Sequence, residues 1–566
     1  MIFKKCFPGK DCPIEGMCGK IVIVAQSKRI KTGGLFLMKK RVSLSICLAF
    51  LLALLMGITA NAAASMTIAT CQIVGSNVVV TAAGTVAASD DGNYYLFALQ
   101  PYETAIGSRT DYCAVAPKAA TVQMTTTLDL DTAASKIYAR FEIAVLSGGK
   151  YVSVSNDFYI TNPEAAAKAA GAAYPTATKK GLTLDARNWT DLVELGCGYT
   201  LYELDMSQFY NVGGLDYVYN GKTYSFNPVT VAQYDAIANV CALSNTNLII
   251  AVKNTYNPAT LDLYYPQARQ AGYKGYAFNT AEQGGAEKIQ ALMHFLAERY
   301  AGTGLGTVQS WIIGNEVNNN NPWHWAGRRS VTEFSELYAK EVRMCYNAIK
   351  SANATANVYI NLDQRWLWED GTHDQYGGKK VLDAFNTAML TTGNIDWGLS
   401  FHPHALPLTN CKFWSIPSNY RAMNLVSNNE NTKMIIPTNI SVMTSYMQKP
   451  QFIAPDGTFR SVIISEMLFT SSNRSYATNE TIQAAAMTYG YKLMAAQPLI
   501  DVVIIHRDRD AASEIAEGMA CGLRNTDGTP KFSYEIFKYM DQPGSTATNF
   551  ALPIIGASSW QQLGLN

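Results

Sequence analysis

Two stretches of the sequence end an apolar run in a glutamate. One is Trp311–Asn318, which contains Asn315 and Glu316, and the other is Val462–Glu466. Such apolar runs are typical of strands buried on both faces, as in a parallel sheet covered by helices. Folds of that kind place their chemistry at the carboxyl ends of the strands. The pattern therefore predicts catalysis by a carboxylate pair, Glu316 and Glu466. The competing interpretation is that each glutamate pairs with an arginine or caps a helix.

The elements that would position these glutamates lie between residues 181 and 545, where strand-like runs alternate with amphipathic helical patterns. One helical pattern begins with Ser330 and Glu333, the spacing of a capping box. This alternation predicts an α/β fold, a (β/α)8 TIM barrel with loop insertions. A doubly wound open sheet is the alternative, but no glycine-rich phosphate loop follows an early strand. The eight predicted strands are Leu201–Met206, Leu248–Val252, Tyr276–Phe278, Ser310–Gly314, Val358–Leu362, Trp397–Phe401, Val462–Ile464 and Val502–Ile505.

The regions on either side of the predicted barrel have a different composition. Residues 66–162 contain short β-branched runs separated by turn residues, which predicts a small all-β, sandwich-like domain. Its expected role is packing on the main domain or binding a polymer. Residues 163–180 are alanine-rich and are expected to form a linker, and residues 546–566 a C-terminal tail.

The N-terminus has the pattern of an export signal. Basic residues follow Met38, an apolar run covers residues 42–58, and small residues suited to cleavage end the segment. This order predicts a signal peptide over 38–64, with 1–37 as an upstream extension outside the fold. A single membrane anchor is the alternative, since the apolar run is slightly long. The expected protein is secreted or held at the cell surface, with no membrane partner after cleavage of the signal.

The bulk composition limits the possible partners. The chain has 566 residues, 16% of them charged, and a formal net charge of +1. Because nucleic-acid binding needs a basic face, this balance argues against a nucleic-acid partner. The oligomeric state is not indicated. Seven cysteines follow the signal, and none has CxxC spacing. A Cys71–Cys113 disulfide is about as probable as two free thiols, and the other cysteines are expected to be small buried side chains.

The strand ends resemble those of a known group of enzymes. Asn315-Glu316 ends the fourth predicted strand and Glu466 the seventh, as in the TIM-barrel retaining glycoside hydrolases of clan GH-A. In that clan the first glutamate is the acid/base and the second the nucleophile. More narrowly, the stretches IIGNEVN, SFHPH and ISEMLFTS are similar to the uncharacterised secreted family called domain of unknown function 5722. The resemblance implies a retaining O-glycosidase acting on a polysaccharide or oligosaccharide.

The chemistry itself sets requirements on these residues. A retaining mechanism holds two carboxyl groups about 5–5.5 Å apart across the glycosidic bond. Glu316 would need a raised pKa to hold its proton near neutral pH, whereas Glu466 would need a normal or lowered one. Asn315 can donate a hydrogen bond to a sugar hydroxyl beside the reacting carbon.

Further residues near the predicted strand ends are candidates for substrate contact. His402 and His404 end the sixth strand, where many clan members have a tyrosine that hydrogen-bonds the nucleophile. The two histidines could instead bind a metal, with His324 and His373 as further ligands. No HExxH pattern or carboxylate cluster accompanies them, so we expect no metal and no cofactor. The other candidates for substrate binding are Trp323, Trp325, Arg365, Trp366, His506 and Arg507.

Each of these candidates has a plainer alternative. Tryptophan rings stack on sugar faces, but they also anchor loops by burial. His506 and Arg507 replace the tryptophan frequent at this position in the clan, and they could bind substrate or close a salt-bridge network. Apolar residues follow Glu466 where many relatives have a glycine. These departures leave a non-catalytic glycan-binding protein on a degenerate barrel as the second hypothesis, and a metal-dependent hydrolase using His402 and His404 as the third.

Overall fold

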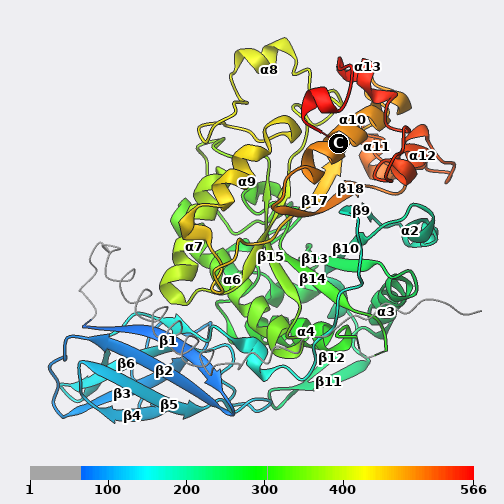
Figure 1. Cartoon of the computed structure of the whole chain (residues 1–566). Coiled ribbons are helices and arrows are strands. Elements are labelled where there is room, and N and C mark those ends of the chain that lie inside the picture. Colours follow the sequence, from blue (N-terminus) through cyan, green and yellow to red (C-terminus); the bar gives the residue numbers. More distant parts are fainter. Residues whose placement is uncertain (1–64, 303, 566) are drawn as a thin grey trace, which may run out of the picture. The chain divides into compact units, whose positions relative to one another are not determined.

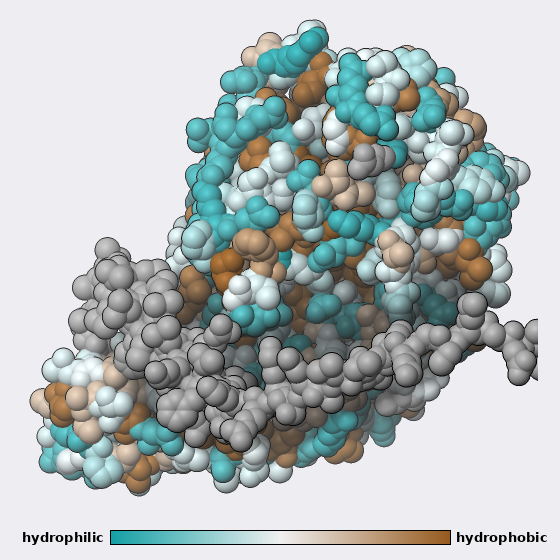
Figure 2. Space-filling model, viewed as in Figure 1, coloured by the Kyte–Doolittle hydropathy of each residue, from teal (hydrophilic) through white to brown (hydrophobic). Residues whose placement is uncertain are grey.

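The computed structural model describes residues 65–302 and 304–565 of the chain (Figure 1). The predicted upstream extension and signal peptide lie outside these residues. Within the described part of the chain, no helix is both long and apolar enough to cross a membrane. Hydrophilic and hydrophobic residues are interspersed on the face of the molecule seen in Figure 2.

The N-terminal strands form two antiparallel sheets. One sheet has the order β1-β2-β5, and the other has the order β4-β3-β6-β7 with β8 paired to β6. Buried and exposed residues alternate along β1 and β5, so one face of each strand enters a shared core that includes Ile68, Leu96 and Ile143. This layering confirms the expected sandwich-like β-region. The strands are β1 (Met66–Val74), β2 (Asn77–Gly84), β3 (Asn93–Leu99), β4 (Ala114–Pro117), β5 (Thr121–Thr127), β6 (Arg140–Ser147), β7 (Lys150–Ser153) and β8 (Phe158–Tyr159).

Eight parallel strands then close into a barrel, which confirms the predicted (β/α)8 fold. The chain order of these strands is also their order around the barrel. Strand β16 is buried at every residue, the pattern expected for a strand covered by helices. The barrel strands are β9 (Lys180–Thr183), β10 (Tyr199–Asp205), β13 (Asn247–Lys253), β14 (Val308–Ile313), β15 (Asn357–Asp363), β16 (Trp397–His402), β17 (Val462–Leu468) and β18 (Ile500–His506).

Helices separate most of the barrel strands, and a two-stranded hairpin, β11 (Leu215–Tyr219) with β12 (Lys222–Phe226), follows β10. The expected capping box is present: the Ser330 hydroxyl accepts from the Glu333 N–H, and the Glu333 carboxylate accepts from the Ser330 N–H. The α-helices are α2 (Asp191–Glu194), α3 (Pro228–Leu243), α4 (Gln283–Arg299), α5 (Asn320–Trp323), α6 (Val331–Ala352), α7 (Gly378–Thr392), α8 (Ser418–Ala422), α9 (Ser441–Met447), α10 (Glu480–Ala495), α11 (Ala512–Ala516), α12 (Phe532–Tyr539) and α13 (Ala551–Ile555).

Two strand assignments made from the sequence are wrong, and they offset each other. The first barrel strand is β9, which the sequence assigned to the end of a linker because its residues Lys180–Thr183 carry a lysine and a glycine. Tyr276–Phe278 is apolar but lies outside the barrel, and its residues make only isolated bridges. One strand was missed and one added before β14, so β14 and β17 remain the fourth and seventh strands.

The side chains inside the barrel change from apolar to polar toward the carboxyl ends of the strands. Inward side chains of the strands pack into one apolar layer, and Ile312, Tyr359 and Ile463 belong to it. Because side chains alternate along a strand, residues two positions farther along face the same interior one level higher. There the side chains become polar: Asn361 lies on β15 and Ser465 on β17. The apolar layer is therefore the floor of the candidate site.

The β-region and the barrel share a continuous hydrophobic core that runs from Met66 to Met540. Polar contacts also join them, since the Asn347 side chain on α6 donates to the Ile137 carbonyl at 2.8 Å. The C-terminal segment packs against α10 through Trp560 and Leu565 instead of forming a free tail.

The possible Cys71–Cys113 disulfide is not formed, and all seven cysteines of the described residues are free thiols. The Cys113 thiol instead donates to the Leu96 carbonyl. Cys71 is fully buried, and burial raises the pKa of its thiol.

Candidate active site

Glu316 follows β14 in an unusual backbone conformation. The strand is followed by Gly314, whose φ is +80°, and Glu316 itself has a φ of +42°. A non-glycine residue in this left-handed region costs about 1–3 kcal/mol and needs support from its surroundings. Asn361 on β15 supplies that support, because its side-chain oxygen accepts from the Glu316 N–H and its carbonyl accepts from the Val317 N–H at 3.2 Å. The turn aims the carboxyl group into the barrel mouth.

Two histidines from β16 and the loop after it hold the Glu316 carboxylate. His402 Nδ1 lies 3.0 Å from Glu316 Oε1, and His404 Nε2 lies 3.4 Å from the same oxygen. All three side chains are buried. Burial alone would raise the pKa of Glu316, but the hydrogen bonds that His402 and His404 make to its carboxylate outweigh burial and hold the pKa below its usual range. The sequence-based expectation of a raised pKa is therefore wrong for the ligand-free protein.

Glu466 faces the same histidine from β17. His404 Nε2 lies 3.6 Å from Glu466 Oε1 and 3.4 Å from Glu316 Oε1. The two carboxylate oxygens are therefore no farther apart than the sum of these distances, about 7 Å. The side chain of Glu466 is 25% exposed and that of Glu316 only 11%, so Glu466 is the more accessible of the pair. The structure brings together the two glutamates that the sequence singled out.

A strand irregularity lets two consecutive residues of β17 reach the barrel interior. Neighbouring residues of a regular strand point to opposite faces. The pairing of β17 with β18 shifts register between Ile464 and Met467, as at a β-bulge. Ser465 can therefore contact His402 while Glu466 contacts His404.

Three polar residues that the sequence analysis missed complete the surroundings of His402. Ser465 Oγ lies 2.8 Å from His402 Nε2, and Ser400 Oγ lies 2.5 Å from Ser465 Oγ. The Asn361 side-chain amide donates to Ser400 at 2.7 Å and also faces His402 Nε2 at 3.1 Å. No motif marks these residues, because an asparagine and two serines inside apolar strands are common. Their positions two residues beyond the apolar floor are the only signal in the sequence.

Glu316, His402 and His404 offer three ligand atoms within 4.8 Å of one another, which is the donor set of many zinc sites. The amide group beside His402 bears on whether these atoms could hold a metal ion. Asn361 Oδ1 accepts from a backbone N–H, which turns its NH₂ group toward His402 Nε2. An N–H donor at Nε2 favours the tautomer with the ring proton on Nδ1, and that tautomer offers no lone pair on Nδ1 to a metal. His324, a possible further ligand by sequence, pairs with Glu341 instead.

Arg365 and the loop after β14 form a neighbouring network. Arg365 pairs with Asp363 at the end of β15. Asn318 donates to Asp363 Oδ1 at 2.7 Å and accepts from the Asp363 N–H at 2.8 Å. These bonds tie the loop that carries Glu316 to β15. Asn315, just before Glu316, is half-buried.

The end of β18 carries a salt-bridge network, one of the two expected roles of His506 and Arg507. Both side chains contact Glu514 Oε1, at 2.8 and 3.1 Å. Burial alone would lower the pKa of His506, but Glu466 and Glu514 raise it above its usual range. Across the mouth, Lys253 pairs with Glu203, whose side chain is 51% exposed although it points into the barrel. The mouth is thus polar and open to solvent.

The assignment of Trp325 and Trp366 as sugar-stacking residues is wrong, because both indoles are buried. Trp325 stacks on Tyr273 with ring centroids 4.1 Å apart, and Trp366 packs edge-on against Tyr446. Both anchor loops by burial. Trp323 is only half-buried, and the Lys274 ammonium lies 4.6 Å from its ring centroid.

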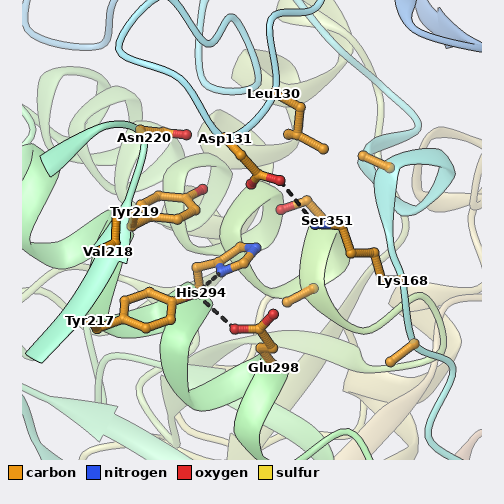
Figure 3. A pocket seen from close by; sticks show the side chains of 13 residues that line it. Leu130, Asp131, Lys168, Tyr217, Val218, Tyr219, Asn220, His294, Glu298 and Ser351 are labelled. Carbon is orange, nitrogen blue, oxygen red and sulfur yellow. Dashed lines mark hydrogen bonds and ion pairs between the residues drawn. The ribbon is translucent and has the colours of Figure 1, made fainter. Parts of the chain in front are cut away.

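A separate cavity of about 620 Å³ lies away from the glutamate pair (Figure 3). The Tyr217 hydroxyl contacts His294 Nδ1 at 2.7 Å and donates to Glu298 at 2.9 Å, and Lys168 pairs with Asp131. Burial lowers the pKa of His294 to about 4, so its ring is neutral at physiological pH. Of the charged residues that line this cavity, Lys168 and Asp131 pair with each other and Glu298 accepts from Tyr217, and none of them lies at a barrel strand end.

Comparison with known proteins gives a family but no activity. A family model described as "Family of unknown function (DUF5722)" matches residues 172–563. No curated protein matches the sequence.

Similar solved structures include a family 39 glycoside hydrolase from Bacteroides cellulosilyticus WH2, with 13% identity, a TM-score of 0.44 and coverage of 82% of this chain and 80% of that one. A glucosidase from Croceicoccus marinus has 14% identity, a TM-score of 0.41 and coverage of 67% and 69%. Similarity at this level assigns neither a substrate nor a mechanism.

Proposed function

The chain belongs to the DUF5722 family of unknown function, and we propose that it is a glycoside hydrolase that uses Glu316 as acid/base and Glu466 as nucleophile. The observation that carries the proposal is the pair of carboxylates at the ends of β14 and β17, joined by one histidine nitrogen and no farther apart than about 7 Å. Retaining enzymes hold their two carboxyl groups about 5–5.5 Å apart, and this separation falls within the limit of about 7 Å.

The proposed reaction has two steps. In the first, Glu466 attacks the anomeric carbon while Glu316 gives a proton to the leaving oxygen, which forms a glycosyl–enzyme ester. In the second, Glu316 takes a proton from water, and the resulting hydroxide displaces Glu466 from the sugar. The greater exposure of Glu466 suits a nucleophile that a substrate must reach. The burial of Glu316 suits a group that exchanges its proton only with a bound partner.

The substrate is proposed to be a polysaccharide or oligosaccharide, because the mouth is lined by charged and polar groups able to bind hydroxyls. We propose that Asn315 contacts the sugar beside the reacting carbon, and that His506 at the end of β18 and Arg507 just after it also contact the sugar. We further propose that the protein acts after export, as the N-terminal sequence pattern suggests.

Substitution of each glutamate tests the assignment. With aryl glycosides, Glu466→Gln should lose nearly all turnover, because no nucleophile remains. Glu316→Gln should keep the first step on substrates whose leaving group needs no proton, and azide should rescue its second step. A matched control is Glu287→Gln on α4, whose carboxylate pairs with Lys222 on β12. Full activity of both glutamate variants would contradict the mechanism.

A second candidate function is glycan binding without turnover. It is favoured by the lowered pKa of Glu316, since an ionised carboxylate cannot donate a proton. An activated fluorosugar distinguishes the two functions: covalent labelling of Glu466 supports the hydrolase, whereas reversible glycan binding with no label on Glu466 supports the binding protein.

A further inference from the structure

Glu316 and four residues around it form a closed series of hydrogen bonds, which we call the Glu316 circuit: Glu316, Asn361, Ser400, Ser465 and His402. It begins at the Glu316 N–H, which donates to Asn361 Oδ1. It continues from the Asn361 amide to Ser400, from Ser400 to Ser465 and from Ser465 to His402 Nε2, at 2.7, 2.5 and 2.8 Å. It ends where His402 Nδ1 meets the Glu316 carboxylate at 3.0 Å.

The orientation of Asn361 follows from the first bond of the circuit, and it favours one direction for the bonds that come after it. A backbone N–H can only donate, so the Asn361 oxygen must face Glu316 and the Asn361 NH₂ group must face Ser400 and His402. The Ser400 oxygen accepts from that NH₂ group, which leaves its hydroxyl proton for Ser465. The Ser465 proton is then left for His402 Nε2. With Nε2 accepting, the single ring proton is on Nδ1, where it donates to Glu316.

The circuit is built from consecutive barrel strands and shielded from water. Asn361 lies on β15, Ser400 and His402 on β16, and Ser465 on β17. These four residues are between 0% and 2% exposed. A buried polar atom without a partner is destabilising, so an alternative arrangement in which one donor faced another is disfavoured. The same bonds polarise one another in one direction.

We infer that Asn361, Ser400 and Ser465 are positioning residues that lock His402 in its neutral Nδ1–H tautomer and so direct its proton to the Glu316 carboxylate. The inference deepens the proposed function and rests on it for its catalytic meaning. The geometry separates the two histidines: His402 is fixed as a donor that keeps its proton, whereas His404 contacts both carboxylates and has no partner for its Nδ1.

Other charged groups near Glu316 do not change this assignment. Arg365, two residues past the end of β15, lies near Glu316 but is paired with Asp363. His404 contacts the Glu316 carboxylate from the loop after β16. Glu466 on β17 is linked to Glu316 through their shared contact with His404. None of these groups contacts His402 Nε2, so the tautomer depends on Asn361 and Ser465.

The exchange Asn361→Asp provides the sharpest test. It keeps the oxygen that accepts from the Glu316 N–H and replaces the NH₂ group with an oxygen. His402 Nε2 would then face an acceptor, and we expect His402 to become doubly protonated. Ser465→Ala removes one donor to Nε2 and should leave a mixture of tautomers, whereas Ser465→Thr keeps a hydroxyl and should restore the Nδ1–H form. Ser461→Ala, on the residue just before β17 at the other end of the barrel, is the matched control.

Nitrogen-15 NMR of the six histidines reads the tautomer directly, with the His402 signals assigned by their loss in His402→Gln. This measurement needs no substrate, so it is independent of whether the protein is a glycosidase. An Nε2–H or doubly protonated His402 in the wild-type protein at neutral pH would overturn the inference. So would an unchanged His402 in folded Asn361→Asp. If turnover is observed, kcat/KM should fall on the order of 10- to 100-fold in Asn361→Asp and Ser465→Ala, as for other outer-shell changes, and recover in Ser465→Thr.

Discussion

At the scale of single residues, Glu316 decides what the site can do at a given pH. His402 and His404 hold its carboxylate, and its pKa is lowered in the ligand-free protein. An acid catalyst must be protonated, and the protonated fraction of Glu316 declines as pH rises through its lowered pKa. We therefore expect kcat/KM, which reports the free enzyme, to be greatest at acidic pH and to fall toward neutrality.

Substitution of His404 tests this dependence. His404→Ala removes one hydrogen-bond donor to the ionised Glu316 carboxylate, so the pKa of Glu316 should rise, and the basic limb of the kcat/KM profile should move to higher pH by roughly one unit. His373→Gln, on an exposed residue remote from the carboxylates, is the control and should leave the profile in place. A basic limb that stays fixed in His404→Ala would place the catalytic proton on a group other than Glu316.

At the scale of elements, two buried aspartates, Asp191 and Asp508, lie in α2 and just past β18. Asp191 at the start of α2 accepts from Arg524 at 2.6 and 2.8 Å and from the Tyr534 hydroxyl at 2.9 Å. Asp508, two residues past β18, is fully buried, and neither of its carboxyl oxygens has a hydrogen-bond partner. Burial, with the Asp191 carboxylate beside it, raises the pKa of Asp508 to about 7.

This raised pKa predicts a loss of stability as pH rises. An aspartate in the unfolded chain titrates near 3.9, so between about pH 4 and 7 the folded protein keeps a proton that the unfolded chain releases. The free energy of unfolding should decrease through that window, by up to roughly 4 kcal/mol at about 1.4 kcal/mol per unit, and level off above it. Asp508→Asn stays neutral and should lose less stability between pH 5 and 8. Urea unfolding at both pH values measures the difference, with the exposed Asp216→Asn as control. Equal pH dependence in wild type and Asp508→Asn would contradict the assignment.

At the scale of the whole molecule, the β-region and the barrel share one hydrophobic core. The Tyr138 hydroxyl of the β-region lies 2.6 Å from the Tyr219 hydroxyl of the hairpin after β10. Because neither part can expose its side of this core without cost, we expect the residues from 65 onward to unfold in one calorimetric transition. Tyr138→Phe should lower the temperature of that single transition. Two separate transitions, of which Tyr138→Phe moved only one, would show that the two parts are independent domains.

Much of the fold could be predicted because burial leaves a local pattern. An apolar run covered on both faces is visible residue by residue, and so is the capping box that begins α6. The exceptions have local causes as well. Strand β9 is short and contains Lys180 and Gly181, whereas Tyr276–Phe278 is apolar because it packs among aromatic side chains outside the barrel.

The sequence by itself determined that a glutamate ends each of two buried strands, since strand ends and residue types are local properties. Only the tertiary structure decided what surrounds them. Barrel closure brings Asn361 and Ser465, far apart in the chain, to 3.3 Å, and no spacing rule predicts such a contact. The same closure buries Trp366. It also places two histidines against Glu316 and lowers the pKa of this carboxyl group, whereas its proposed role as an acid calls for a raised pKa. Burial and pKa depend on neighbours in space, and these neighbours come from the register and closure of the sheet.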